Sequence, residues 1–301
     1  MHNIRVSSAT ASLLRLRHWK TDISPTTLYF MLGETCSGNC KYCTQGNGQL
    51  SRVQWPTFPL IDVQKQMRIC HGPRRICLQT LLYKKVVDDV FFAANALKES
   101  LPISVAINPV SAEQMEHLKS IGVERLGLGL DCCSPDIFRQ VKKSVPSWES
   151  YWEALSIAAD IFGTVTTHLI IGLGETDEEA IQVMQHLHEK GSDIALFAHF
   201  PQKKYGTAPS IPRYRSMQLA KHMITRGLGL FQFDRGKLTF IEGPVTSQAF
   251  QTSGCPNCNR PFYNERARGP FYNVPRPLYP HEYKQALSEV KKYVEISNFI
   301  A

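Results

Sequence analysis

The feature that most constrains this fold is the regular alternation of short apolar, β-rich runs with helix-like segments. Strands that alternate with helices lie parallel in one sheet, because each helix carries the chain back to the same end of the sheet. Strands are expected over residues 27–32, 75–79, 103–107, 123–131, 165–173 and 194–200, and helices over 86–100, 112–121, 135–142, 147–162 and 177–190. Six units are too few for a complete eightfold barrel. The pattern therefore predicts an α/β fold built as a partial (β/α)6-type TIM barrel.

The segments on either side of this core differ from it in composition. We expect a barrel core over residues 25–244, an irregular N-terminal extension over 1–24 and an irregular C-terminal extension over 245–301. The N-terminal segment is basic and has no acid before Asp22, a charge pattern typical of a transit peptide, but no linker follows it and we favour an N-terminal helix. The C-terminal extension is rich in turns and proline before a closing helix over 281–296.

A loop with three cysteines follows the first expected strand. Cys36, Cys40 and Cys43 have the spacing C-x3-C-x2-C, and Gly38 and Asn39 give the backbone between them the freedom to turn. Three thiolates on so short a loop can hold three irons of a cubane iron–sulfur cluster and leave the fourth iron open for a ligand. The alternative is a zinc site, completed by a second C-x2-C pair, in a zinc-stabilised binding protein.

That second pair, Cys255 and Cys258, lies on a Gly/Pro-rich turn more than 200 residues further along the chain. Its partner ligands must come from elsewhere in the fold. Cys77, on the second expected strand, is the preferred third ligand, and Cys70 ranks well below it. Small buried residues are our interpretation of the remaining cysteines, Cys70, Cys132 and Cys133. A fourth ligand other than cysteine is left open.

Several side chains that can carry chemistry fall at the C-terminal ends of expected strands, where barrel folds place their active sites. They are Cys36, Asn108, Asp131, Gly172 and His199. Gly172 also begins the turn Gly-Leu-Gly-Glu-Thr, which exposes backbone amides and sets one acid at a helix start. We therefore expect the active site at this edge of the sheet.

Composition argues against several classes of protein. Nine cysteines in 301 residues do not form the short, even-numbered framework of a secreted disulfide scaffold, and thiols committed to metal indicate a cytoplasmic protein. We expect no membrane association, because no apolar run reaches the roughly 18 residues of a membrane span. We expect no nucleic-acid partner, because the lysine pairs are scattered without interleaved aromatic residues.

The net charge of +8 can instead steer an acidic protein partner toward this chain. Three arginines near the second cysteine pair, Arg260, Arg266 and Arg268, either bind an anion or are solvated.

The three-cysteine loop, with Tyr42 directly before its third cysteine, resembles the signature of the radical S-adenosylmethionine (SAM) enzymes. The resemblance implies a barrel of the radical SAM type and a [4Fe-4S] cluster held by Cys36, Cys40 and Cys43. It also implies that the open iron chelates the amino and carboxylate groups of SAM. One electron from the cluster then breaks the sulfonium bond, and the 5′-deoxyadenosyl radical removes hydrogen from an unactivated C–H bond.

Two further stretches resemble the biotin synthase and lipoyl synthase group. They are Gly172-Leu-Gly-Glu-Thr176 and Leu130-Asp131 followed by Ser134-Pro135. In that group the acid that matches Asp131 binds the ribose of SAM, although capping of the following helix is an alternative role for this residue. The cofactor contacts that the resemblance implies are Tyr42, Asp131, Gly172, Gly174 and Glu175.

The stretches 75–80, 253–265 and 272–278 are similar to the two-component lipoyl synthases, and the similarity extends from about residue 30 to 278. In that family, two paralogous radical SAM chains each insert one sulfur into an octanoyl group bound to a carrier protein. The resemblance implies a second [4Fe-4S] cluster, held by Cys77, Cys255 and Cys258, as the sulfur donor, and no catalytic residue beyond the cluster ligands. The implied partners are an octanoylated carrier (a glycine cleavage H protein or a lipoyl domain), a paralogous radical SAM subunit and a reducing electron donor.

The chain departs from the patterns of the two better-known enzymes of this group. Biotin synthase holds its sacrificial cluster with cysteines on consecutive barrel strands, and Cys77 matches the first of them. The expected strand over 103–107 has no cysteine, and Thr166 stands where the pattern has another. The single-chain lipoyl synthase has a cysteine-rich motif before its radical SAM loop, whereas no cysteine precedes Cys36 here. A biotin-synthase-like or other radical SAM enzyme acting on a small molecule is the alternative function.

Overall fold

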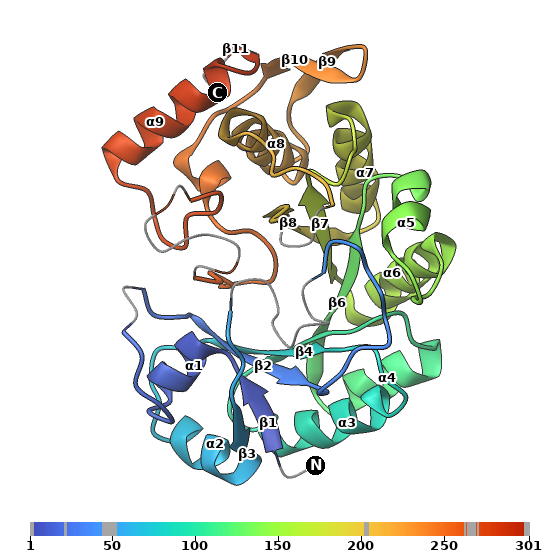
Figure 1. The fold of residues 1–301 in the computed structure, drawn as a ribbon, viewed down its shortest axis with the longest axis vertical. Helices are drawn as coiled ribbons and strands as arrows, with labels where there is room; N and C mark the ends of the chain where they lie inside the picture. Colours follow the sequence, from blue (N-terminus) through green and yellow to red (C-terminus); the bar gives the residue numbers. More distant parts are fainter. Residues whose placement is uncertain are drawn as a thin grey trace.

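The computed structural model describes residues 3–20, 23–43, 53–201, 205–261, 263, 269 and 271–297. Eight strands form one sheet in the order β3-β1-β2-β4-β5-β6-β7-β8 (Figure 1). From β2 to β8, neighbouring strands are parallel. Within the described ranges no strand pairing joins β8 to the other end of the sheet, so the barrel is open. The predicted α/β fold with a partial (β/α)6 barrel is confirmed.

All six predicted strands are present. They are β2 (Thr27–Leu32), β4 (Arg75–Thr80), β5 (Ile103–Ala106), β6 (Val123–Asp131), β7 (Val165–Ile171) and β8 (Ser192–Ala198). Every position of β2 is buried, because a strand in a parallel sheet is covered on both faces and therefore reads as a continuous apolar run. These apolar runs made the strands recognisable from the sequence.

Five helices connect the parallel strands from β4 to β8 and pack outside the sheet (Figure 1). They are α3 (Val86–Leu97), α4 (Ala112–Ser120), α5 (Pro135–Val141), α6 (Trp148–Phe162) and α7 (Asp177–Glu189). Four of them begin after a capping side chain, from Ser111, Ser134, Ser147 and Thr176, that accepts a hydrogen bond from the backbone amide three residues on. The predicted helices are confirmed. In the described part of the chain no helix is both long and apolar enough to cross a membrane.

The N-terminal segment contains more structure than the helix we expected. Strand β1 (Asn3–Val6) pairs antiparallel with β2 and with β3 (Thr57–Pro59), and only then does the short helix α1 (Ser8–Leu13) follow. Ile4 and Val6 are buried while the residues between and before them are not, a period-two pattern too short to be recognised in the sequence. Helix α2 (Leu60–Met67) comes directly after β3.

The chain beyond β8 also differs from expectation. It forms α8 (Ile211–Ile224), the hairpin β9 (Leu230–Asp234) and β10 (Lys237–Glu242), a 3-10 turn η2 (Ser247–Phe250), α9 (Pro280–Lys291) and β11 (Glu295–Ser297). The closing helix predicted over 281–296 is wrong at its end, because the chain leaves α9 after Lys291 and β11 pairs in parallel with β10. This second sheet joins strands from both sides of the predicted boundary at residue 244, and the domain boundaries themselves stay predictions.

Candidate active site

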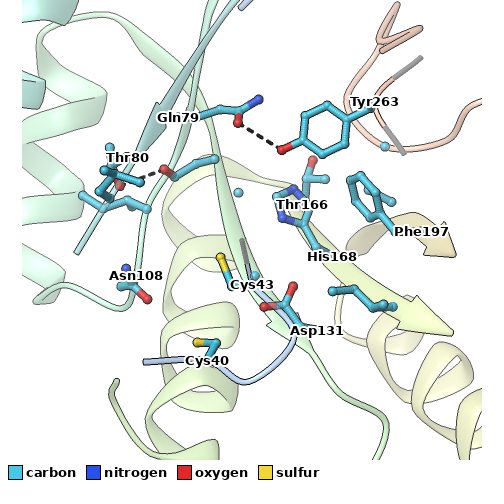
Figure 2. Close-up of a pocket in the computed structure, with 18 of the residues that line it drawn as sticks. Cys40, Cys43, Gln79, Thr80, Asn108, Asp131, Thr166, His168, Phe197 and Tyr263 are labelled. Carbon is cyan, nitrogen blue, oxygen red and sulfur yellow. Dashed lines mark hydrogen bonds between the residues drawn. The ribbon is translucent and has the colours of Figure 1, made fainter. Parts of the chain in front are cut away.

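A cavity of about 310 Å³ lies inside the open barrel and is lined by both cysteine motifs. All six cysteines predicted as cluster ligands line it, namely Cys36, Cys40, Cys43, Cys77, Cys255 and Cys258. Figure 2 shows Cys40, Cys43 and Asp131 in one part of the cavity and Gln79 and Tyr263 in another. The structure therefore brings together two cysteine motifs, residues 36–43 and 255–258, that are more than 200 residues apart in the sequence.

The first cysteine loop (Cys36–Cys43) is fixed by its own backbone. The amides of Ser37, Asn39 and Lys41 each donate a hydrogen bond of 2.8 Å to a backbone carbonyl of another segment. The acceptors are the carbonyls of Leu82, Lys143 and Val141, in that order. Burial raises the pKa of the Cys40 thiol to about 11, against the opposing effect of the Lys142 ammonium. The loop thus holds the Cys40 thiol in a partly buried position beside Lys142.

Asp131 accepts two hydrogen bonds from polar side chains beside this loop. Its Oδ2 accepts hydrogen bonds from the Tyr42 hydroxyl at 2.6 Å and from the Lys142 ammonium at 3.0 Å. Burial is the largest single effect on the Lys142 ammonium and lowers its pKa, but Asp131, Tyr151 and Cys40 together raise the pKa of this lysine above its usual value. Ser134, and not Asp131, caps α5. The capping role that the sequence left open for Asp131 is therefore wrong, and its contact with SAM stays a prediction.

The wall next to Asp131 has room for a ligand. Gly129 lines the cavity, and a Cβ atom placed on it would lie 3.3 Å from Asp131 Oδ1 and 3.5 Å from His168 Nδ1. The absence of a side chain at Gly129 therefore leaves both polar atoms accessible to a bound molecule. Burial lowers the pKa of His168 to about 4, so this ring is neutral at physiological pH.

The glycine turn after β7 does not reach the cavity. Glu175 folds back onto its own turn, where its carboxylate oxygens accept hydrogen bonds from the amides of Gly172 at 2.7 Å and Leu173 at 2.9 Å. Arg213 binds the same carboxylate at 3.0 Å. Neither Gly172, Gly174 nor Glu175 lines the cavity. In the structure Glu175 holds the turn, and the SAM contacts of these three residues stay predictions.

We expect Gly172→Ala to lower the free energy of unfolding by about 2–5 kcal/mol. Gly172 has φ +110, and a Cβ atom there would lie 2.6 Å from the Thr207 carbonyl oxygen. Gly174 has a similar φ of +117, but nothing lies within 4 Å of its Cβ position. Gly174→Ala should therefore cost only the backbone strain, about 1–2 kcal/mol. Urea denaturation measures both, and equal losses would contradict the steric argument.

The second cysteine loop (Ser253–Arg260) is anchored to two separate strands. On one side, the Asn259 amide group accepts a hydrogen bond from the Thr26 amide and donates one to the Ser24 carbonyl, each at 3.0 Å, next to the start of β2. On the other side, the Leu196 amide in β8 donates to Ser253 Oγ at 3.1 Å. The loop thus bridges the two sides of the open barrel.

The thiols of this loop meet Cys77 inside the barrel. Burial raises the pKa of the Cys77 thiol, and the next largest causes are the neighbouring Cys255 and Cys258. Cys77 and Cys258 also pack, together with Cys36 of the first loop, against one small apolar cluster. The cluster consists of Tyr29, Met31, Trp55 and Leu81. The choice of Cys77 as third partner of the second pair is consistent with this placement.

Two other predictions from the sequence concern the remaining cysteines and the three arginines near the second loop. Cys132 and Cys133 are buried in the main apolar core, in agreement with our interpretation, and Cys70 is partly buried against the same core. The Arg260 guanidinium stacks 3.9 Å from the centre of the Phe197 ring and donates to the Ser253 carbonyl at 2.8 Å, and its binding of an anion stays a prediction. Arg266 and Arg268 lie outside the described residues.

The donor chemistry of both cysteine sets fits an iron–sulfur cluster. Each set offers three thiols, which are the protein ligands that such clusters use. Among the described residues, no three Cys, His, Asp or Glu side chains lie close enough to hold a single metal ion. A cubane binds each thiolate to a different iron and so does not require this close approach.

Known proteins resemble the segment that contains the first loop. The family model of the radical SAM superfamily matches residues 30–187, which is more than half of the chain. The chain belongs to the radical SAM superfamily. Enzymes of this superfamily use a [4Fe-4S] cluster and SAM, so this protein is a radical SAM enzyme.

Curated relatives match at low identity. Biotin synthase of Mycobacterium leprae (strain Br4923) is 26% identical over 166 residues, which cover 52% of this chain and 47% of that protein. Biotin synthase of Mycobacterium tuberculosis (strain ATCC 25618 / H37Rv) is 24% identical over 193 residues, which cover 62% of this chain and 54% of that protein. The chain therefore spans about half the length of these relatives.

Solved radical SAM structures share the fold. The FeFe-hydrogenase maturase HydG from Carboxydothermus hydrogenoformans has a TM-score of 0.54 at 15% identity, over 91% of this chain and 58% of that one. Methylornithine synthase (PylB) has a TM-score of 0.54 at 12% identity, over 66% of this chain and 62% of that one. At these identities the likeness shows the fold alone.

Sequence reasoning missed several polar residues that line the cavity of this radical SAM enzyme. Lys142 looked like one of a solvated pair with Lys143, yet its ammonium is buried and lies 3.3 Å from the Tyr151 hydroxyl. Thr166, His168 and Ile170 alternate along β7 and all line the cavity. A period-two reading of this strand as inward-facing was the available signal for His168.

Proposed function

We propose that this radical SAM enzyme inserts sulfur into an unactivated C–H bond, as one component of a two-component lipoyl synthase. One observation carries the proposal. Two sets of three cysteines line the same cavity, so a radical generator and a sulfur source would face one substrate. Replacement of an aliphatic hydrogen by sulfur needs both within reach of the same carbon atom.

In this proposal the first loop holds the SAM-binding cluster through Cys36, Cys40 and Cys43. When bound, that cluster and SAM supply reductive cleavage of the sulfonium bond and a radical that abstracts hydrogen. Asp131, held by Tyr42 and Lys142, orients the ribose of SAM through its free Oδ1 side. The buried wall around the loop keeps water away from reactive species.

The second set, Cys77, Cys255 and Cys258, holds the sulfur-donating cluster in this proposal. When bound, that cluster would supply a sulfide for the new C–S bond and an iron to take up the one electron left when the substrate carbon radical bonds to that sulfide. This chain departs from the cysteine pattern of biotin synthase, and this departure supports a set of cluster ligands different from the one that biotin synthase uses. Thr166 replaces a strand cysteine of that pattern, and the second loop brings Cys255 Sγ to 3.2 Å from the Thr166 hydroxyl.

The proposed substrate is an octanoyl chain on a carrier protein, and the proposed partners are that carrier, a paralogous radical SAM subunit and a reducing electron donor. Similarity of the C-terminal stretches to the two-component lipoyl synthases supports this choice, as does a net charge of +8 for docking an acidic carrier. The second candidate function is sulfur insertion into a free small molecule. Similarity to the biotin synthases over about half their length favours it.

Mass spectrometry of an octanoylated lipoyl domain decides between these functions. Anaerobically reconstituted protein, with SAM and a strong reductant, is incubated with the octanoylated domain or with free octanoyl-lysine amide, each with and without the paralogue. We expect a mass gain of one sulfur atom on the domain only. Sulfur on the free amide alone would favour the small-molecule function. Zinc in place of about eight irons per chain would exclude both.

A further inference from the structure

Two hydroxyl groups lie against the sulfur atoms of the second cysteine loop. The Tyr29 hydroxyl on β2 is 3.3 Å from Cys258 Sγ, and Thr166 Oγ1 on β7 is 3.2 Å from Cys255 Sγ. The first loop has no part in these contacts. Both hydroxyl-bearing residues are buried, with exposed fractions of 5% for Tyr29 and 1% for Thr166.

The surroundings fix the direction of both hydrogen bonds. The Tyr29 oxygen accepts a hydrogen bond from the Arg260 amide at 2.9 Å, and the Thr166 oxygen accepts one from the Arg125 guanidinium at 3.2 Å. Each hydroxyl has a single proton of its own and accepts through its lone pairs. An iron-bound thiolate has no proton to give, so in the loaded site only the hydroxyls can donate.

Arg125 is well placed to hold this arrangement. Its side chain is 8% exposed, bridges Thr166 and Asp193, and comes from β6, the neighbour of β7 in the sheet. In a dry site, a hydrogen bond from a charged donor polarises the hydroxyl and strengthens the bond that this hydroxyl donates in turn. The third thiol has a donor as well, because the Gln79 side chain hydrogen-bonds to Cys77.

We propose that Tyr29 and Thr166 raise the reduction potential of the second cluster by donating hydrogen bonds to the sulfur atoms of Cys258 and Cys255. The inference rests on the second cluster of the proposed function. Donors to cluster sulfurs stabilise the additional negative charge of the reduced state. A higher potential favours transfer to iron of the electron that is left when the substrate carbon radical bonds to sulfide. Tyr29 and Thr166 are thus positioning residues, since they act through the cysteine ligands.

The test is an EPR-monitored redox titration of the reconstituted full-length chain. In a background of Cys36→Ala, Cys40→Ala and Cys43→Ala, only the second cluster can assemble. Tyr29→Phe and Thr166→Val should each shift the midpoint to more negative potential. We expect up to a tenfold change in the ratio of reduced to oxidised cluster at fixed potential, or about 59 mV for a one-electron couple.

Matched variants separate hydrogen bonding from general disruption. Thr166→Ser keeps the hydroxyl and should keep the parent potential. Tyr283→Phe removes a hydroxyl that donates to the Val245 carbonyl at 3.0 Å, away from the cavity, and should cause no shift. Equal potentials in the parent, Tyr29→Phe and Thr166→Val would overturn this inference and leave the second cluster standing. Absence of any cluster from the parent background, while the wild-type chain binds only about four irons, would instead remove the proposed function.

Discussion

Replacement of Cys40 by alanine should abolish SAM cleavage. Cys40 lies in the middle of the first cysteine loop, whose backbone is pinned to its neighbours, so no other thiol can move into its place. Two cysteines remain, and a cubane needs three to leave one iron open for SAM. We expect 5′-deoxyadenosine production to fall by at least about a thousandfold, which corresponds to about 4 kcal/mol in the activation barrier. Anaerobic incubation with SAM and dithionite, followed by chromatography, measures it.

Cys70→Ala is the control for this experiment. Cys70 packs against the main core and does not line the cavity, so its loss should leave SAM cleavage intact. Production of 5′-deoxyadenosine by Cys40→Ala at the rate of the wild type would remove the first loop from the chemistry.

Replacement of Cys258 by alanine should separate the two halves of the reaction. The first loop is untouched by this change, so SAM cleavage should continue. Sulfur insertion should fall by at least about a thousandfold, because the sulfur source loses one of its three protein ligands. Iron content should fall from about eight to about four per chain. The measurement pairs 5′-deoxyadenosine release with the mass of the octanoylated lipoyl domain.

Two outcomes of the Cys258→Ala experiment would contradict the expected result. Unchanged sulfur insertion in Cys258→Ala would show that the second loop takes no part in the mechanism. Loss of SAM cleavage together with sulfur insertion would mean that the variant disrupts the cavity as a whole. Cys70→Ala again supplies the control, with both activities expected at the level of the wild type.

The parallel core could be predicted because its signal is local. A strand such as β2 is buried at every position and so reads as an uninterrupted apolar run. Short strands at the margins, such as β1 and β11, carry too few residues for a period-two pattern to be recognised. Helix α8 was missed for another reason, since it buries polar residues such as Arg215 and Gln218 that mask an apolar stripe.

In the candidate site, too, some features could be predicted from the sequence and others could not. Each cysteine motif is a short run of sequence, so its spacing could be recognised without the fold. The polar contacts around the motifs depend on packing between distant strands, as with Lys142 and Asp131 or Tyr29 and Cys258. The contact between Glu175 and its own turn could not be predicted either, because an acid in a glycine turn reads alike whether it faces a ligand or its own backbone amides.

The way in which the second loop bridges the barrel has a mechanical consequence. Paired strands such as β7 and β8 are joined by a continuous ladder of backbone hydrogen bonds, whereas this loop is fastened to them and to β2 by a few side-chain contacts. Detaching it costs less than parting any two strands of the sheet. Movement of the loop away from the barrel would carry Cys255 and Cys258 with it, while Cys77 would stay on β4.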